Sequence, residues 1–135
     1  MMKELKEMEK LSAAMEDYLK TIYHLSSCNS AIYIREIARQ MRVSKASVCR
    51  ATDFLCRKGL IVKNKYQDLS LTEEGYKQAA LLSRKNSILQ KFLSEILHID
   101  PNVADKDACS IEHGISLESF QSICRYLESR GITLN

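Results

Sequence analysis

Apolar side chains recur at helical spacing along most of the chain, and this pattern predicts a mostly α-helical protein. Residues 12–27 form the first amphipathic segment, with Ser12 placed to cap its N-terminus. Residues 33–41 form a second, shorter segment whose apolar positions again lie three and four residues apart. Two helices separated by a short polar loop are therefore expected in this part of the chain.

A third helix is expected after a turn of only three residues. Ser44 is a suitable N-cap, apolar residues follow at helical spacing, and Gly59 stands where a C-terminal glycine commonly ends a helix. Two short helices joined by so tight a turn are typical of a helix-turn-helix. The second helix begins with Ser, Lys and Arg, as expected of a recognition helix that enters the major groove of DNA.

The pattern changes in residues 60–72, which predict two short strands around a polar tip from Lys63 to Asp68. A β-hairpin directly after a recognition helix is a wing. The order helix, turn, helix and hairpin therefore predicts a winged helix-turn-helix.

Helical spacing returns for the remainder of the chain. A long helix is expected over residues 73–97, another from Pro101, and a last one over residues 116–131. The long helix exceeds what a winged module needs, so its second half should pack against the final helices or another subunit. The predicted fold is mostly α, with a winged helix-turn-helix DNA-binding domain over residues 1–75 and an all-helical dimerisation domain over residues 76–135.

Composition excludes several classes of protein. No apolar run approaches the roughly 20 residues that cross a bilayer. The opening stretch MMKELKEMEK also lacks the apolar core of a signal peptide. We therefore expect a cytoplasmic protein with no membrane partner. Its five cysteines are then expected to be reduced thiols, and the lack of a CxxC pair argues against a zinc knuckle.

Positive charge is concentrated in the predicted winged region. Residues 35–65 hold nine Lys or Arg against two acidic residues, a local charge of +7, whereas the whole chain carries +3. Such a basic block suits a phosphate-binding face, although a merely solvated basic surface is the alternative. The candidates for DNA contact are Ser44, Lys45, Ser47 and Arg50 on the recognition helix, with Lys63 and Lys65 on the wing.

These candidates are expected to differ in role. Arg50 can read a guanine edge with two hydrogen bonds, whereas the lysines and serines are better suited to phosphates. Ser44 has a second explanation, because an N-cap serine is needed there in any helix.

Residues 107–116, DACSIEHGIS, contain three potential metal ligands on one helical face. Cys109, Glu112 and His113 stand at i, i+3 and i+4. A thiolate, a carboxylate and an imidazole together suit a divalent transition metal. Cys109 taken alone is also explained as an ordinary buried cysteine.

Four segments together resemble the diphtheria-toxin-repressor family of iron- and manganese-dependent transcriptional regulators. They are MEDYLKTIYHL (15–25), IREIARQMRVSKASVCRATDFLCRKGLI (34–61), LSLTEEG (69–75) and DACSIEHGIS (107–116). The length resembles that of the short, two-domain manganese branch of that family. The resemblance implies a homodimeric repressor that senses Fe(II) or Mn(II), binds double-stranded operator DNA and controls genes of metal homeostasis, with no small-molecule substrate.

The resemblance also implies a metal site. By matching motif, the ligands would be Asp17, Cys109, Glu112 and His113. The aspartate is similar to the manganese branch and the cysteine to the iron branch, and the softer thiolate tilts the expectation modestly toward iron.

Four positions depart from the family pattern of a second metal ion. Lys20 replaces an acidic residue, Asn86 a histidine and Gln90 a glutamate, and Asp105 stands where iron-type members have another histidine. One metal ion per subunit is therefore expected.

Two alternatives remain open from the residues alone. One is a metal-independent winged-helix regulator with a degenerate metal site. The other is an enzyme with a Cys109–His113 pair, but no glycine-rich loop supplies an oxyanion pocket, so the chain is not expected to be an enzyme.

Overall fold

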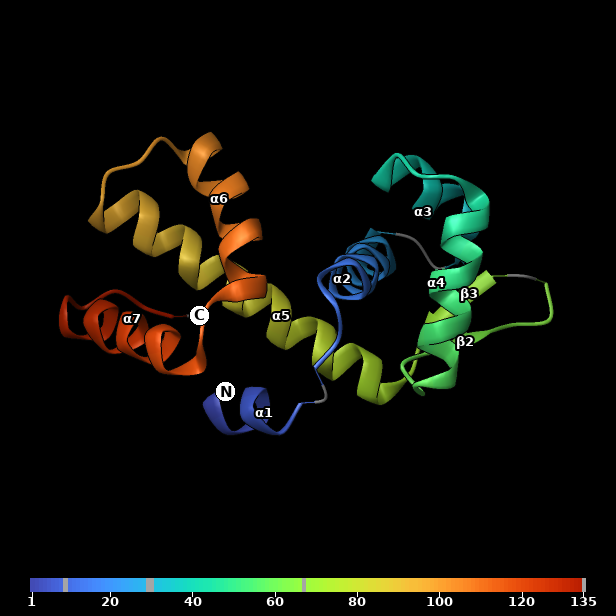
Figure 1. Cartoon of the computed structure of the whole chain (residues 1–135), viewed down its shortest axis with the longest axis horizontal. Helices are drawn as coiled ribbons and strands as arrows, with labels where there is room; N and C mark the ends of the chain where they lie inside the picture. Colours follow the sequence, from blue (N-terminus) through green and yellow to red (C-terminus); the bar gives the residue numbers. More distant parts are fainter. Residues whose placement is uncertain (9, 29–30, 67, 135) are drawn as a thin grey trace. The chain divides into compact units, whose positions relative to one another are not determined.

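The computed structural model describes residues 1–8, 10–28, 31–66 and 68–134. The chain divides into two compact units. Residues 10–80 form one, here called the winged unit. Residues 1–9 together with 81–135 form the other, here called the helical unit. Figure 1 shows the helices and strands of each.

The winged unit contains the expected helix-turn-helix and hairpin. Its elements are α2 (Ala13–Cys28), β1 (Ile32–Tyr33), α3 (Ile34–Met41), α4 (Lys45–Arg57), β2 (Ile61–Lys63), β3 (Asp68–Leu71) and the start of α5 (Glu73–Lys91). Ser12 and Ser44 cap α2 and α4 as predicted, because the Oγ atoms accept from the backbone N–H groups three residues later, at 3.2 and 3.1 Å.

Apolar faces of the three helices meet over the small sheet. Leu19 and Ile22 of α2, Ile37 of α3 and Val48 and Leu55 of α4 are fully buried. In the sequence, these residues belong to the apolar positions that recur at helical spacing. Burial of these stripes supplies the main stabilisation of the unit.

The sheet has one strand that the sequence did not predict. In the described residues it is antiparallel with the order β1-β3-β2, and Ile32 of β1 pairs with Leu69 of β3. β1 is only two residues long, too short for alternation to reveal it. β3 supplies the hydrogen-bonding edge that makes these residues a strand.

The helical unit is built around the second half of α5. It also contains α1 (Met2–Glu7), the π-helical turn η1 (Phe92–Ile96), α6 (Pro101–Gly114) and α7 (Leu117–Ser129). Its core includes Leu5 of α1, Ile88 and Leu89 of α5, and Phe120 and Leu127 of α7. Neither α1 nor the π-helical turn was predicted. The predicted end of the long helix near Leu97 agrees with the end of η1, and the mostly helical fold class is confirmed.

The described residues contain no helix that combines the length and the apolar character needed to cross a bilayer.

The start of α5 is held against the base of the hairpin. Thr72 Oγ1 accepts from the N–H of Gly75 at 3.0 Å and donates to the carbonyl oxygen of Gly59 at 2.7 Å. The Thr72 N–H donates to the carbonyl oxygen of Leu60 at 3.0 Å. Gly75 consequently lies so close to Leu60 that a Cβ atom at this position would be 1.8 Å from that oxygen.

Gly75→Ala is therefore expected to destabilise the protein by about 1–3 kcal/mol, the usual cost of overpacking a tight contact. The measurement is the midpoint of urea unfolding of the metal-free protein, followed by circular dichroism. Gly114→Ala is the matched control, because a Cβ atom there meets nothing within 4 Å. Equal midpoints for the two variants would contradict the steric explanation.

Candidate metal centre and DNA-binding surface

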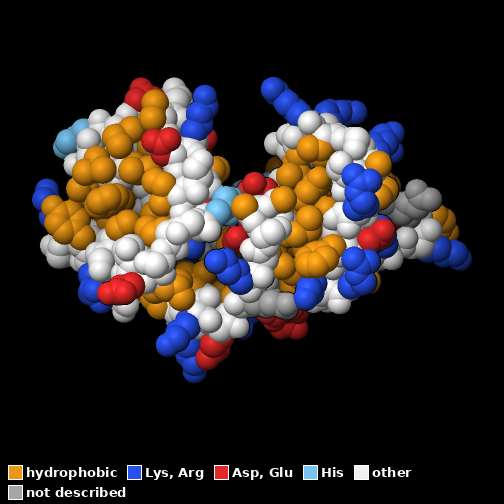
Figure 2. Space-filling view, viewed as in Figure 1, with side chains coloured by type: hydrophobic (Ala, Val, Ile, Leu, Met, Phe, Trp, Pro, Cys, Tyr) orange, Lys and Arg blue, Asp and Glu red, His pale blue; other side chains and the backbone are white. Residues whose placement is uncertain are grey.

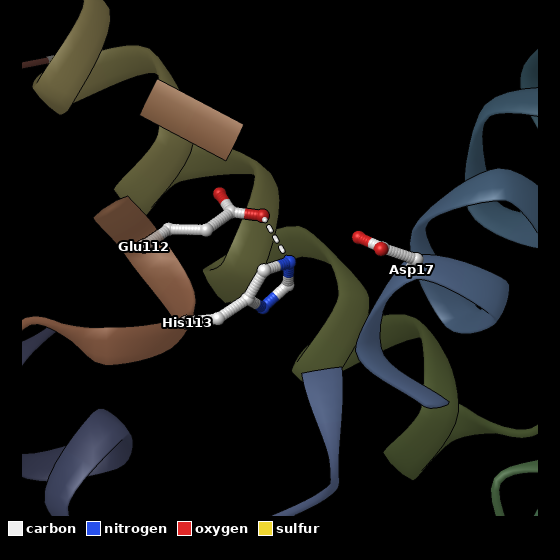
Figure 3. Close-up of side chains that lie close together, drawn as sticks. All are labelled: Asp17, Glu112 and His113. Carbon is white, nitrogen blue, oxygen red and sulfur yellow. Dashed lines mark ion pairs between the residues drawn. The ribbon is translucent and has the colours of Figure 1, made fainter. Parts of the chain in front are cut away.

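The helix α6 carries three of the four predicted metal ligands. Asp100 caps it, its carboxylate accepting from the N–H of Asn102 at 2.9 Å, and Pro101 occupies the first turn, where proline is favoured. Glu112 is buried, with 2% of its surface exposed. His113 Nε2 lies 3.6 Å from Glu112 Oε1, and the dashed line in Figure 3 marks this ion pair. The carboxylate and the imidazole thus lie side by side.

Side chains of α5 hold this face of α6 in place. Lys85 Nζ donates to the carbonyl oxygen of Glu112 at 2.8 Å, and Lys85 is itself buried. Asn86 Nδ2 donates to the Cys109 sulfur at 3.6 Å. The structure therefore pairs Glu112 with His113 and places the Cys109 thiol against Asn86. Sequence reasoning missed Lys85, because a lysine between apolar helical positions gives no signal of a bond to a residue 27 positions later.

Asp17 lies on α2, in the winged unit, and is labelled in Figure 3. It is half-buried, and its carbonyl oxygen accepts from the Thr21 hydroxyl at 2.9 Å. The carboxylate, imidazole and thiol that α6 carries are donors that suit divalent iron or manganese.

The N-terminus of α4 has an ordered polar surface. Ser44, Lys45 and Arg50 are exposed, and Ser47 is half-buried. Ser47 Oγ accepts from Ser44 Oγ at 3.0 Å and from Arg50 Nη2 at 3.3 Å. These bonds direct the Arg50 guanidinium back along the start of the helix. Three of the four residues predicted to contact DNA from this helix, Ser44, Ser47 and Arg50, are therefore joined by hydrogen bonds.

The two wing lysines have different surroundings. Lys63, in β2, forms an ion pair with Asp53 of α4, which joins the wing to the recognition helix. The hydrogen bond and the charge of Lys63 lower the pKa of the exposed Asp53 carboxyl, so the pair persists into more acidic solution. Lys65 lies in the turn beyond β2 and is exposed. Figure 2 shows Lys and Arg side chains spread over the part of the molecule that carries α3, α4 and the hairpin.

Comparison with family models decides the family. Residues 10–69 match the model of the iron dependent repressor N-terminal DNA binding domain. Residues 72–131 match the model of the iron dependent repressor metal binding and dimerisation domain. The chain belongs to the iron dependent repressor family. The resemblance inferred from its motifs is confirmed.

Individual relatives agree with this assignment. An uncharacterised HTH-type transcriptional regulator of Methanocaldococcus jannaschii is 29% identical over 87% of this chain and 95% of its own length. The HTH-type transcriptional regulator MntR of Listeria monocytogenes is 31% identical over 82% of this chain and 77% of its own. Among solved structures, the manganese regulator SloR is 31% identical, with a TM-score of 0.74 over 84% of this chain.

This chain spans about half the length of the SloR chain, 53% of it. The family and the named relatives are transcriptional regulators, which agrees with the prediction of a DNA-binding regulator.

The cysteines are expected to differ in reactivity. Cys28 and Cys109 are exposed, whereas Cys124 is buried, and burial raises the pKa of the Cys124 thiol. Because the thiolate is the nucleophile, iodoacetamide should alkylate Cys124 at least about tenfold more slowly than the exposed pair at neutral pH. Because its pKa is raised, the Cys124 rate should keep increasing as the pH rises above neutral.

Peptide mass spectrometry of a time course on the metal-free protein measures these rates. Urea-unfolded protein, in which all five thiols should react alike, is the control. Equal rates for Cys124 and Cys28 in the folded protein would contradict the structure.

Proposed function

We propose that this chain is a homodimeric, metal-dependent transcriptional repressor that acts in the cytoplasm and binds one Fe(II) or Mn(II) ion per subunit. The observation that carries the proposal is the buried Glu112 carboxylate beside His113, within the segment that matches a metal-binding and dimerisation domain. DNA binding by residues 1–75 and metal binding and dimerisation by residues 76–135 remain predictions.

The proposed ligands are Asp17, Cys109, Glu112 and His113. Asp17 belongs to the winged unit and the other three belong to the helical unit. An ion held by all four would supply a strong electrostatic link between the two units. Such a link favours arrangements of the two winged units of a dimer that match the operator, and so raises operator affinity.

The recognition helix α4 is proposed to enter the major groove. Arg50 would read a base edge there, and Ser44, Lys45 and Ser47 would hold phosphates. On the wing, Lys65 is exposed and suits a phosphate, whereas Lys63 serves DNA binding partly by fixing the wing to Asp53. A twofold dimer would place two such helices about one turn of DNA apart, on a nearly palindromic operator.

Dimerisation is proposed to use exposed apolar side chains of the helical unit. Leu97 is 51% exposed, Val103 49% and Tyr126 43%. Figure 2 shows a hydrophobic area over the part of this unit that carries the end of α5 with α6 and α7. Burial of this apolar surface against a second copy of the chain would stabilise a dimer.

Metal is expected to raise operator affinity at least tenfold, which corresponds to about 1.4 kcal/mol of coupling. The measurement is fluorescence anisotropy of DNA from the promoter of the protein's own gene, titrated with metal-stripped protein. Anaerobic Fe(II) and Mn(II) are tested separately. Cys109→Ala and Glu112→Gln should abolish the response, whereas Cys28→Ala, which removes another exposed thiol, should retain it.

Equal affinity with and without metal would overturn the proposed sensing. It would favour the metal-independent winged-helix regulator, because the fold and the basic surface of α4 would still bind DNA.

Val103→Asp is expected to weaken the dimer, because a carboxylate would have to be desolvated in the proposed interface. Sedimentation equilibrium of the metal-free protein should show a dissociation constant raised by about tenfold or more. Val62→Asp is the matched control, since Val62 is 48% exposed but lies on β2 of the winged unit. A dimer unaffected by Val103→Asp would place the interface elsewhere.

A further inference from the structure

A chain of polar side chains joins α5 to α6 beside Cys109. Asn86 and Gln90 stand one turn apart on α5, and Asp105 and Cys109 stand one turn apart on α6. Gln90 Nε2 donates to Asn86 Oδ1 at 2.7 Å and to Asp105 Oδ1 at 2.8 Å. Asn86 Nδ2 donates to Cys109 Sγ at 3.6 Å. Four side chains are thus linked by three hydrogen bonds.

All three hydrogen bonds run outward from Gln90, toward Asp105 at one end of this network and toward Cys109 at the other. Both protons of the Gln90 amide have acceptors, and the Asn86 amide accepts one bond and donates one. The two ends are a carboxylate and a thiol, which are the groups that can carry negative charge. Amide protons are therefore directed toward both anionic ends.

This arrangement is unfavourable for a cation. Asp105 and Cys109 by themselves would be suitable ligands for a divalent metal. A metal ion held at this place would also need lone pairs from Asn86 and Gln90, whereas these two amides present N–H groups to Cys109 and Asp105. The residues at this place do not fit a second metal ion.

We propose that Asn86 and Gln90 form a metal-free clamp, which takes the place of a second ion and positions the Cys109 sulfur for the single metal site. The inference rests on the proposed function, because it assigns a role toward the same metal. Asn86 is a positioning residue: its N–H fixes the direction in which the sulfur presents its remaining lone pairs. Outer hydrogen bonds of this kind typically change metal affinity by roughly 10- to 100-fold.

The first experiment is a Co(II) titration of the metal-stripped full-length protein. The near-ultraviolet thiolate-to-cobalt band reports on sulfur ligation, and equilibrium dialysis with elemental analysis gives the stoichiometry. Wild type should bind one ion per subunit. Asn86→Ala should bind about tenfold more weakly, with a shifted band, because the sulfur loses its donor. Ser87→Ala, a change at the exposed neighbour on α5, should match wild type within about twofold.

The second experiment replaces the two amides, which donate hydrogen bonds, with side chains that offer lone pairs to a metal ion. The double variant Asn86→His/Gln90→Glu offers an imidazole and a carboxylate beside Asp105 and Cys109. It should take up a second equivalent of Co(II) or Mn(II) that wild type does not bind. Asp105→Ala in that background should remove the second equivalent again.

Three outcomes would overturn the clamp. They are two ions per subunit in wild type, an Asn86→Ala variant with the affinity and spectrum of Ser87→Ala, and a double variant that stays at one ion. Metal-dependent operator binding can be present in all three cases, so the proposed repression would stand, and two ions in wild type would correct only its proposed stoichiometry. If wild type binds no Co(II), Fe(II) or Mn(II), the proposed function fails and the clamp fails with it.

Discussion

A buried ammonium group holds α6, which carries three of the four proposed metal ligands, against α5. Lys85 of α5 reaches the main-chain oxygen of Glu112 at 2.8 Å, and the same ammonium lies 5.7 Å from the centre of the Phe120 ring of α7. A buried charge must be compensated, so α5, α6 and α7 are constrained to meet at this point. Glu112 and His113 project from the turn that this bond fixes. The placement of the ligands thus follows from the packing of the helical unit.

The polar contacts between α5 and α6 fall into two groups with different consequences. Lys85 acts on the backbone of α6 and determines where the helix lies. Asn86 and Gln90 act on side chains and determine where the Cys109 sulfur and the Asp105 carboxylate point. The two groups also differ in solvent exposure, since Lys85 is buried whereas Asp105 and Cys109 are exposed. The exposed pair is therefore open to adjustment that leaves the core intact.

The winged unit shows a comparable division. Its apolar core orients α4, while a few polar contacts set the geometry of the exposed surface. Ser47 directs Arg50, and Asp53 holds the wing through Lys63. Thr72 fastens the end of the hairpin to the start of α5, next to the glycine that this close approach requires. The proposed metal would act on the arrangement of these surfaces, because a ligand shifts an equilibrium toward the state that it binds more tightly.

The sequence by itself determined most of the helices, because periodicity and caps are local properties. Ser12, Ser44 and Ser116 each cap the helix that the pattern predicted. The i, i+3 and i+4 spacing placed Cys109, Glu112 and His113 on one helix, and the sequence motifs were sufficient to indicate the family.

Only the tertiary structure decided the elements and contacts that need a partner distant in sequence. β1 is a strand because β3 offers an edge, and Leu5 is buried because α1 packs on α7. The bonds from Lys85 to Glu112 and from Asn86 to Cys109 join residues 27 and 23 positions apart. Local spacing contains no information on such pairs, since they form only when the packing of apolar faces has brought two helices together.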